Sequence, residues 1–240
     1  MLKDSSGRMA YVFYQLMWQS LDWLFPPHCG GCGCLGERWC KACQASTKLI
    51  GSEVCAVCGE PNPGGDLCLE CIQQPPVYNH LRSWAVFEGP VREAIHKLKY
   101  NGDIGLGEIL ARQLIKLVKE LGWYYDMVVP VPLSTERLKE RGYNQSALLA
   151  RPIALAFGSR YMPNSLVRVR NTASQVGLNA GERLVNVAGA FRAAPETVKQ
   201  KTILVVDDVT TTGATIQACS EALLQAGASK VLGLTLARAI

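Results

Sequence analysis

Apolar residues recur along residues 81–240 with two alternating periods, one typical of strands and one typical of helices. Strand patterns occur at four places, residues 81–89, 126–132, 202–208 and 230–237. Helical periodicity covers four segments, residues 91–100, 104–121, 144–157 and 213–226. Pro152 lies inside the third helical segment, and we expect it to end or kink that helix. The alternation predicts an α/β domain with a mainly parallel sheet flanked by helices.

Residues 1–25 show a different pattern. Over residues 11–25 the apolar residues form one broad face of a predicted helix. We expect an amphipathic helix docked on the rest of the protein, with attachment to a membrane surface as the alternative. The segment contains no small-residue cleavage site before the cysteines and no apolar run long enough to cross a bilayer. A cytoplasmic, reducing location without a membrane span is therefore expected.

The composition is that of a folded protein. With 240 residues, of which 48% are hydrophobic and 19% charged, the chain can bury a substantial core, which excludes a disordered tail. Residues 73–80 contain paired prolines and predict a linker. We therefore expect a small cysteine-rich domain at residues 26–72 and a larger α/β domain at residues 81–240.

Nine of the ten cysteines lie between residues 29 and 71, and eight of these nine form CxxC pairs. The pairs are Cys29/Cys32, Cys40/Cys43, Cys55/Cys58 and Cys68/Cys71. In a reducing compartment such pairs are typical of Zn2+ ligands, because a tetrahedral ion accepts four thiolates. Four thiolates leave no open position for a substrate, so a structural role is favoured.

Two tandem zinc sites are the expected arrangement, one in each half of the cysteine repeat. Gly33 and Gly59 follow the first CxxC pair of each half, where a turn of positive φ directs backbone N–H groups at the sulfurs. Exchange of pairs between the halves, and metal in only one site, are alternatives that the spacing leaves open. His28 and Cys34 are spare ligands that we expect to be bystanders.

Two adjacent carboxylates, Asp207 and Asp208, stand at the end of a predicted strand and precede a threonine-rich turn. The turn comprises Thr210, Thr211, Thr212, Gly213, Ala214 and Thr215. Hydroxyls, a glycine and a helix N-terminus suit a phosphate, whereas carboxylates suit the hydroxyls of a sugar. The combination predicts a site for ribose 5-phosphate at the carboxyl edge of the sheet. Neither GxxxxGK[ST] nor GxGxxG follows a strand, which excludes a Walker loop and a dinucleotide fingerprint.

Positive charge is concentrated in one part of the chain. Residues 134–170 contain seven Lys or Arg and two Asp or Glu, and this excess equals the net charge of +5 of the whole chain. A diphosphate or a nucleic-acid backbone would require such a surface, and a solvated face is the plain alternative.

Several motifs together resemble a known family. VVDDVTTTGAT is similar to the phosphoribosyl pyrophosphate (PRPP) signature of type I phosphoribosyltransferases. With the cysteine repeat and the segments LKYNGD, PVPLSTERLKERGYNQ and RNTASQVGLNAGERLVNVAGAF, it resembles the ComF family, from LFPPHCGGCG onward. The resemblance implies a type I phosphoribosyltransferase-like sheet behind an N-terminal double zinc ribbon.

The resemblance also implies roles for individual residues. Residues 210–215 would contact the 5-phosphate, and Asp207 and Asp208 the ribose hydroxyls. Residues near the diphosphate would be Pro132, Arg137, Arg141 and Gly142. Residues 170–183 would form a hood over the substrate, and Arg170, Arg183 or Lys99 would assist the leaving group.

The implied reaction is displacement of pyrophosphate from C1 of PRPP with Mg2+, and the acceptor and the occurrence of turnover stay open. The family also implies a role in competence or the use of external DNA. The alternative is a non-catalytic module that binds single-stranded DNA or a protein partner, with basic loops on the DNA phosphates and Tyr143 or tryptophan residues stacking on bases. A third hypothesis is a structural zinc adaptor for a partner such as a competence helicase.

Overall fold

A parallel sheet forms the centre of the protein. The computed structural model describes residues 4–64, 66–170 and 180–240. Within these residues, five strands form the sheet in the order β1-β7-β6-β2-β3, with parallel pairing throughout. They are β1 (His80–Val86), β2 (Met127–Pro130), β3 (Arg160–Tyr161), β6 (Thr202–Thr210) and β7 (Lys230–Arg238). The predicted parallel α/β domain is confirmed.

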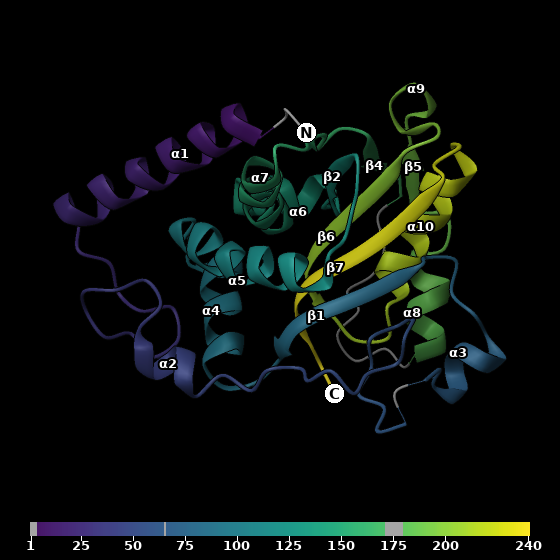
Figure 1. The fold of residues 1–240 in the computed structure, drawn as a ribbon, viewed down its shortest axis with the longest axis horizontal. Coiled ribbons are helices and arrows are strands. Elements are labelled where there is room, and N and C mark those ends of the chain that lie inside the picture. Colours follow the sequence, from purple (N-terminus) through teal and green to yellow (C-terminus); the bar gives the residue numbers. More distant parts are fainter. Residues whose placement is uncertain (1–3, 65, 171–179) are drawn as a thin grey trace.

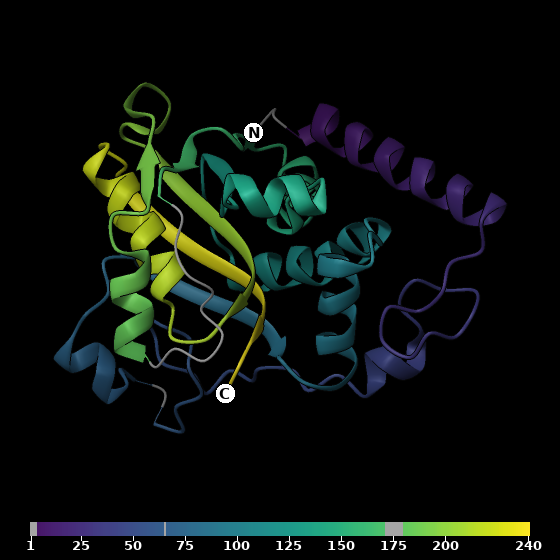
Figure 2. The ribbon, with the colours of Figure 1, turned by 180° about the vertical axis from the view of Figure 1, so that it is seen from behind.

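Helices cover both faces of the sheet (Figures 1 and 2). One face carries α4 (Gly89–Tyr100), α5 (Gly105–Leu121) and α7 (Gln145–Phe157). The other face carries α8 (Ala180–Val187), α10 (Ala214–Gln225) and the antiparallel pair β4 (Leu166–Arg168) and β5 (Phe191–Ala193). Because both faces are covered, β6 is apolar on both sides: Leu204 packs toward α5 and α7, and Val205 packs toward α10.

The long periodic segments were predicted close to their observed bounds, but the short elements were not. Between the predicted strand 126–132 and the predicted helix 144–157 lies α6 (Thr135–Arg141), which was not predicted. Residues 158–200 contain β3, β4, β5, α8 and α9 (Pro195–Val198), also without a prediction. Such elements are too short to show a hydrophobic period, so their formation depends on tertiary contacts.

The prediction that Pro152 ends or kinks its helix was wrong in its stronger form, because α7 continues to Phe157. Pro152 is buried together with Leu149 and Ile153. Packing of this apolar face against α5 and the sheet outweighs the backbone hydrogen bond that the proline removes.

The N-terminal helix α1 (Asp4–Leu24) packs against α7 and lies at the periphery of the molecule (Figure 1). Tyr11, Tyr14 and Trp18 are on its partly buried side, whereas Phe13 and Trp23 are 72% and 83% exposed. The expected docked helix is therefore observed, beginning earlier than predicted. Among the described residues, no helix is both long and apolar enough to cross a membrane.

The cysteine-rich region wraps along the edge strand β1. Its two short helices, α2 (Lys41–Ala45) and α3 (Leu69–Gln73), lie at opposite ends of this region (Figure 1). Between them, the Ile50 N–H donates to the Trp84 carbonyl at 3.1 Å, and the Val86 N–H donates to the Lys48 carbonyl at 2.9 Å. These bonds cover the outer edge of β1, which would otherwise expose unpaired backbone groups.

Candidate functional site

Asp207 and Asp208, called here the acid pair, lie near the carboxyl end of the central strand β6. Both side chains point into the protein, and the two residues are 8% and 3% exposed. The Ser146 hydroxyl donates to Asp207 Oδ1 at 2.7 Å, and the Gln145 amide donates to Asp208 Oδ1 at 2.9 Å. The first turn of α7 therefore fixes both carboxylates.

Lys99 supplies the positive charge beside this pair. Lys99 lies in the last turn of α4, and its ammonium forms an ion pair with Asp208 Oδ2. The sequence proposed Lys99 for the leaving group, and the structure places it directly on the acid pair. Arg141 contacts the Gln145 side chain and stacks over the Tyr100 ring, so α4, α6 and α7 converge on this point.

Burial strongly perturbs the ionisation of Asp207. Loss of solvent, together with the neighbouring charge of Asp208, raises the pKa of Asp207 to about 7. The hydrogen bond from Ser146 and the charge of Lys99 act in the opposite direction. Carboxyl groups with such a pKa cluster at functional sites, although structural networks produce them too.

Residues 210–215, called here the threonine loop, connect β6 to α10. Gly213 precedes α10 with φ +81°, a conformation that glycine adopts without strain. The Thr212 hydroxyl accepts from the Ala214 N–H at 3.4 Å, and Thr211 and Thr215 are partly exposed. Hydroxyls and the N-terminal end of a twelve-residue helix thus follow the acid pair directly, as a phosphate site requires.

The basic residues proposed for the diphosphate lie on and near α6. Arg137 is exposed, whereas Arg141 is half-buried through its contacts with Gln145 and Tyr100. Tyr143 is also engaged, because its hydroxyl donates to the Leu98 carbonyl at 2.6 Å. Its role as a base-stacking residue would therefore require that it leave this contact.

Of the two proposed catalytic arginines, Arg170 has a side chain that the structure describes, and it contacts backbone carbonyls. Arg170 donates to the carbonyls of Asn186 and Ala188 at 3.0 and 2.7 Å, which joins the end of β4 to the end of α8. Arg183 lies in α8, and its side chain is outside the described part of the structure. Most of the predicted hood, residues 171–179, also lies outside the described residues.

Both halves of the cysteine repeat gather their sulfurs. The second cysteine cluster contains Cys55, Cys58, Cys68 and Cys71, and the four sulfurs lie within 4.8 Å of one another. The first cysteine cluster meets the same criterion with Cys29, Cys32, Cys34 and Cys40, and Cys43 Sγ lies 3.6 Å from Cys29 Sγ. Cys34, expected to be a bystander, is thus a fifth thiol beside the predicted four.

The geometry of both clusters fits Zn2+. The Cys40 N–H donates to Cys29 Sγ, and the Cys68 N–H donates to Cys55 Sγ, each at 3.4 Å. Such donors stabilise thiolate ligands, and Gly33 and Gly59 have φ values of +78° and +71°, as predicted. The clusters therefore support zinc binding by each half separately.

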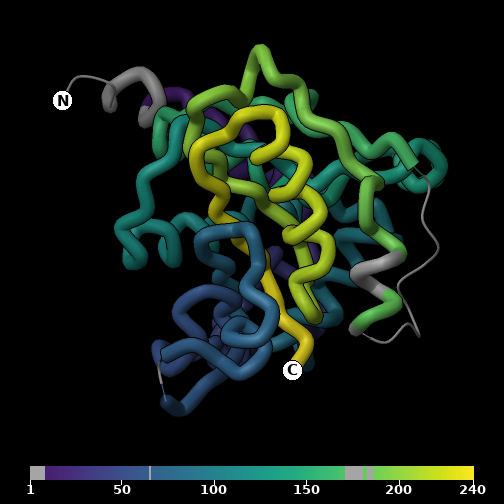
Figure 3. Tube along the Cα trace, turned by 90° about the vertical axis from the view of Figure 1, so that its right-hand side faces the viewer, coloured from purple at the N-terminus to yellow at the C-terminus, as the bar shows by residue number. Residues whose placement is uncertain are grey.

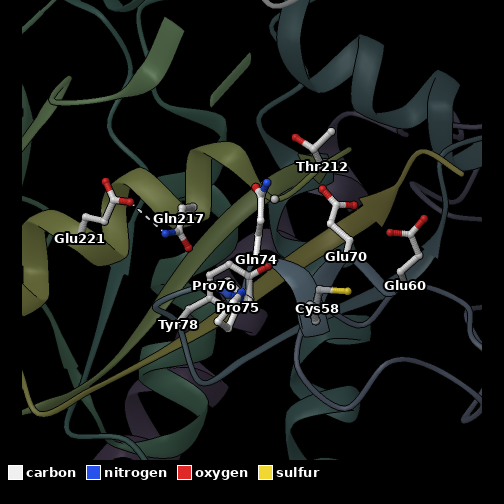
Figure 4. Close-up of a pocket in the computed structure, with 12 residues that line it drawn as sticks. Cys58, Glu60, Glu70, Gln74, Pro75, Pro76, Tyr78, Thr212, Gln217 and Glu221 are labelled. Carbon is white, nitrogen blue, oxygen red and sulfur yellow. Dashed lines mark hydrogen bonds between the residues drawn. The ribbon is translucent and has the colours of Figure 1, made fainter. Parts of the chain in front are cut away.

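A cavity of about 180 Å³ lies between the second cysteine cluster and the threonine loop (Figure 4). Cys58 and Cys71 of the second cysteine cluster and Thr212 and Gly213 of the threonine loop are among the residues that line it, together with Tyr78. The cysteine-rich region thus reaches the candidate phosphate loop.

Sequence reasoning missed several residues of this site. Gln145 and Ser146 stand 61 to 63 positions before the carboxylates that they contact. Arg168, on β4, is half-buried near Arg137, Asp207 and Arg170, and loss of solvent lowers its pKa. Arg238, near the end of the chain, is 2% exposed and contacts both the second cysteine cluster and the threonine loop. Only the basic or polar character of these residues marked them in the sequence.

Comparison with known proteins identifies two domain families in the chain and several relatives. Residues 20–72 match a double zinc ribbon domain, and residues 143–239 match a phosphoribosyl transferase domain. DNA utilization protein YhgH of Salmonella typhimurium is 34% identical over 198 residues, covering 80% of this chain and 86% of YhgH. Competence protein ComFC of Bacillus subtilis is 28% identical and covers 84% of this chain and 85% of its own. A glutamine PRPP amidotransferase from B. subtilis is 22% identical, covering 55% of this chain and 27% of its own, with a TM-score of 0.39.

The fold and the cysteine clusters define a type I phosphoribosyltransferase-like protein with an N-terminal double zinc ribbon. Its 34% sequence identity to YhgH, over most of both chains, identifies the family within this class. The chain belongs to the ComF family, together with DNA utilization protein YhgH and the competence proteins F and ComFC.

Proposed function

We propose that the acid pair and the threonine loop bind the ribose 5-phosphate part of PRPP or of another phosphorylated ribose. One observation carries the proposal: two buried carboxylates and a hydroxyl-rich helix start follow each other at the carboxyl edge of a parallel sheet. Carboxylates accept hydrogen bonds from sugar hydroxyls, and the helix start favours the phosphate.

The surroundings of the acid pair support binding of a ligand that carries both hydroxyls and negative charge. Gln145, Ser146 and Lys99 already orient the carboxylates, so little reorganisation is needed on binding. The exposed Arg137 and the half-buried Arg168 would attract a diphosphate. Mg2+, which prefers oxygen ligands, would neutralise part of the diphosphate charge when bound with PRPP.

Calorimetric titration with PRPP and Mg2+ tests this function. We expect binding by the wild type and at least a tenfold weaker Kd for Asp208→Asn, which removes a charged hydrogen-bond acceptor. Asp126→Asn is the matched control. Asp126 is exposed and directly precedes β2, at the amino end of the strands, where its carboxylate accepts a hydrogen bond from the Thr202 N–H. Absence of PRPP binding by the zinc-loaded wild type would sink the proposal.

Whether the protein also transfers the phosphoribosyl group is a separate question. Displacement at C1 of PRPP breaks the bond to the pyrophosphate oxygen, forms a bond to the acceptor and releases pyrophosphate. Lys99 is the residue best placed to act near this reaction, because its ammonium already lies on Asp208. Release of pyrophosphate in the presence of nucleobases would show turnover, whereas PRPP binding without release would favour a sensor or binding module.

We also propose a role in the uptake or use of DNA, because the relatives are named for DNA utilization and competence. The specific observation in this chain is the basic surface of α6, where Arg137 and Lys139 are exposed. Single-stranded DNA would bind there through its phosphates.

Fluorescence anisotropy with labelled single-stranded DNA tests the DNA proposal. We expect binding that weakens with salt, and a reduced salt slope for Arg137→Gln/Lys139→Gln. Lys116→Gln/Lys119→Gln removes two exposed lysines of α5 and serves as the matched control. Equal loss of affinity in both double variants would indicate nonspecific attraction and contradict a site on α6.

A further inference from the structure

The side chain of Arg238 is buried between two functional parts of the protein. Its backbone is fixed in the sheet, since Arg238 on β7 lies opposite Val86 of β1 and Thr210 of β6. The residue is only 2% exposed. An arginine at such a position is costly to bury unless its guanidinium group is paired, so its partners indicate its role.

The guanidinium group of Arg238 contacts the turn that carries Cys58 of the second cysteine cluster. Arg238 Nη2 donates to the carbonyl of Cys58, one of the four clustered thiols. Arg238 Nη1 lies 3.7 Å from the Glu60 carboxylate, two residues further along. The cluster is also pressed onto β1, because the Leu81 N–H donates to the Val57 carbonyl at 2.8 Å and a Cβ on Gly59 would lie 2.2 Å from the Leu81 carbonyl oxygen.

The same guanidinium group also contacts the threonine loop. Arg238 Nη1 donates to the Thr211 carbonyl at 3.1 Å, and the next residue, Ala239, donates its N–H to the Thr210 carbonyl at 2.9 Å. Figure 3 shows the end of the chain running beside the cysteine-rich loops. One buried side chain therefore joins the turn that presents Cys58 to the loop that we assign to phosphate.

Tyr78 forms a second connection between the same two parts. It is 4% exposed, it lies near Cys58 and Cys71, and its hydroxyl would be 3.0 Å from a Cβ on Gly213. Tyr78 thus packs beneath the residue of positive φ that begins α10. The first cysteine cluster has a different attachment, because the Lys97 ammonium donates to the Cys29 carbonyl at 2.9 Å and joins that cluster to α4.

Charge also favours this arrangement. A Zn2+ ion with four thiolates has a net charge of −2, and two guanidinium groups reach the backbone of the turn from Cys55 to Cys58. Arg82 donates to the Ala56 carbonyl at 2.9 Å, and Arg238 donates to the Cys58 carbonyl. The filled second cluster would therefore hold Arg238 in place by attraction as well as by hydrogen bonding.

We propose that Arg238 is a positioning residue that couples the second cysteine cluster to the threonine loop, so that a filled cluster orders the loop for its ligand. The part that concerns the ligand rests on the proposed phosphoribose site, whereas the ordering of the loop does not. Because coupling between two binding sites is reciprocal, a ligand on the loop would raise the zinc affinity of the second cluster by the same factor. The zinc ribbon is then part of the binding site and not a separate folding unit.

Hydrogen exchange of the full-length, zinc-loaded protein tests the coupling without any ligand. We expect the amides of residues 209–216 to exchange at least about tenfold faster in Arg238→Gln. This change corresponds to a free energy of local opening that is lower by about 1.4 kcal/mol. Arg238→Lys, which keeps the charge and one donor group, should show a smaller increase. Arg38→Gln is the matched control, because Arg38 is a partly buried arginine that bridges Asp22 and Asp103 on the other side of the protein.

Cysteine variants of the two clusters test whether the faster exchange of the threonine loop depends on the metal site. Cys29 and Cys55 occupy equivalent positions in the two clusters and are both 0% exposed. Cys55→Ser should increase exchange at residues 209–216 as Arg238→Gln does, and the double variant should show no further increase, because both changes break one connection. Cys29→Ser should leave this segment unchanged. Exchange at residues 203–206, in the buried part of β6, reports whether each variant keeps its fold.

The outcomes separate this proposal from the proposed function. Unchanged exchange at residues 209–216 in both Arg238 variants overturns the coupling, even if PRPP binds. Additive effects of Cys55→Ser and Arg238→Gln overturn it as well, because the metal would then act by another route. Failure of PRPP to bind, with the exchange pattern as expected, contradicts the phosphoribose site alone.

Discussion

The ionisation of Asp207 makes a quantitative prediction about stability. The pKa of this carboxyl is raised from 3.8 to about 7, first by burial and then by the charge of Asp208. Other groups near Asp207 are Lys99, Arg168 and the buried thiol of Cys219. In the folded protein Asp207 therefore keeps its proton over a pH range in which the unfolded chain has lost it.

The sign of the effect follows from proton binding in the two states. Because the folded pKa lies above the unfolded one, the stabilisation is fully present below about pH 4 and is lost as the pH rises toward 7. Between pH 5 and pH 7 the loss amounts to about 2 kcal/mol. Asp207→Asn removes this term and retains an Oδ1 acceptor for the Ser146 hydroxyl and the Asp208 N–H.

Urea unfolding followed by tryptophan fluorescence, at pH values from 5 to 8, measures the effect. We expect the free energy of unfolding of the wild type to fall relative to Asp207→Asn by about 2 kcal/mol between pH 5 and pH 7. The histidines are common to both proteins, so the difference isolates Asp207. Asp126→Asn controls for the loss of one carboxylate. A constant difference between wild type and Asp207→Asn across this range would refute the assignment of a buried, proton-retaining carboxyl.

Three further predictions concern the same site and the cysteine clusters. Ser146→Ala should raise the pKa of Asp207 further, because in the wild type the hydrogen bond from the Ser146 hydroxyl lowers it. The decline of stability with pH should then extend to a higher pH in the same unfolding series. Gly213→Ala should destabilise the protein by about 1 kcal/mol or more, as measured by urea unfolding, because φ is +81° and the new Cβ would lie 3.0 Å from the Tyr78 hydroxyl. Removal of zinc with a strong chelator should lower the melting temperature. The reason is that the proposed ligands Cys29 and Cys55 are buried in the two hydrophobic cores, so loss of the metal would disturb the packing of both. An unchanged melting temperature would contradict a structural role for the metal.

The parts of the site that were predicted from sequence are those that are local in the chain. Asp207, Asp208 and the threonine loop occupy nine consecutive positions, so a strand followed by a helix start is enough to bring them together. CxxC pairs likewise place two sulfurs by one turn of backbone. Periodicity identified the long helices and strands for the same reason, because their signal repeats several times within one element.

The remaining parts depend on contacts between distant segments. Gln145 and Ser146, which the sequence did not indicate, meet the acid pair because α7 packs on one face of the sheet. Lys99, which only the family resemblance indicated, joins them because α4 lies on the same face. The distance between Cys34 and its neighbours likewise depends on how the first cysteine cluster folds. No spacing rule applies to such pairs, since their separation in the sequence is arbitrary.

By itself, the sequence determined the class of fold, the tandem cysteine clusters and the order of acid and hydroxyl groups along the candidate site, because each is encoded within a short stretch of chain. Only the tertiary structure decided that α7 continues through Pro152 and that Arg238 lies between a cysteine turn and the threonine loop. The physical reason is burial: packing of a whole helix face outweighs one lost hydrogen bond, and a buried guanidinium group must find its partners wherever the fold brings carbonyl groups together.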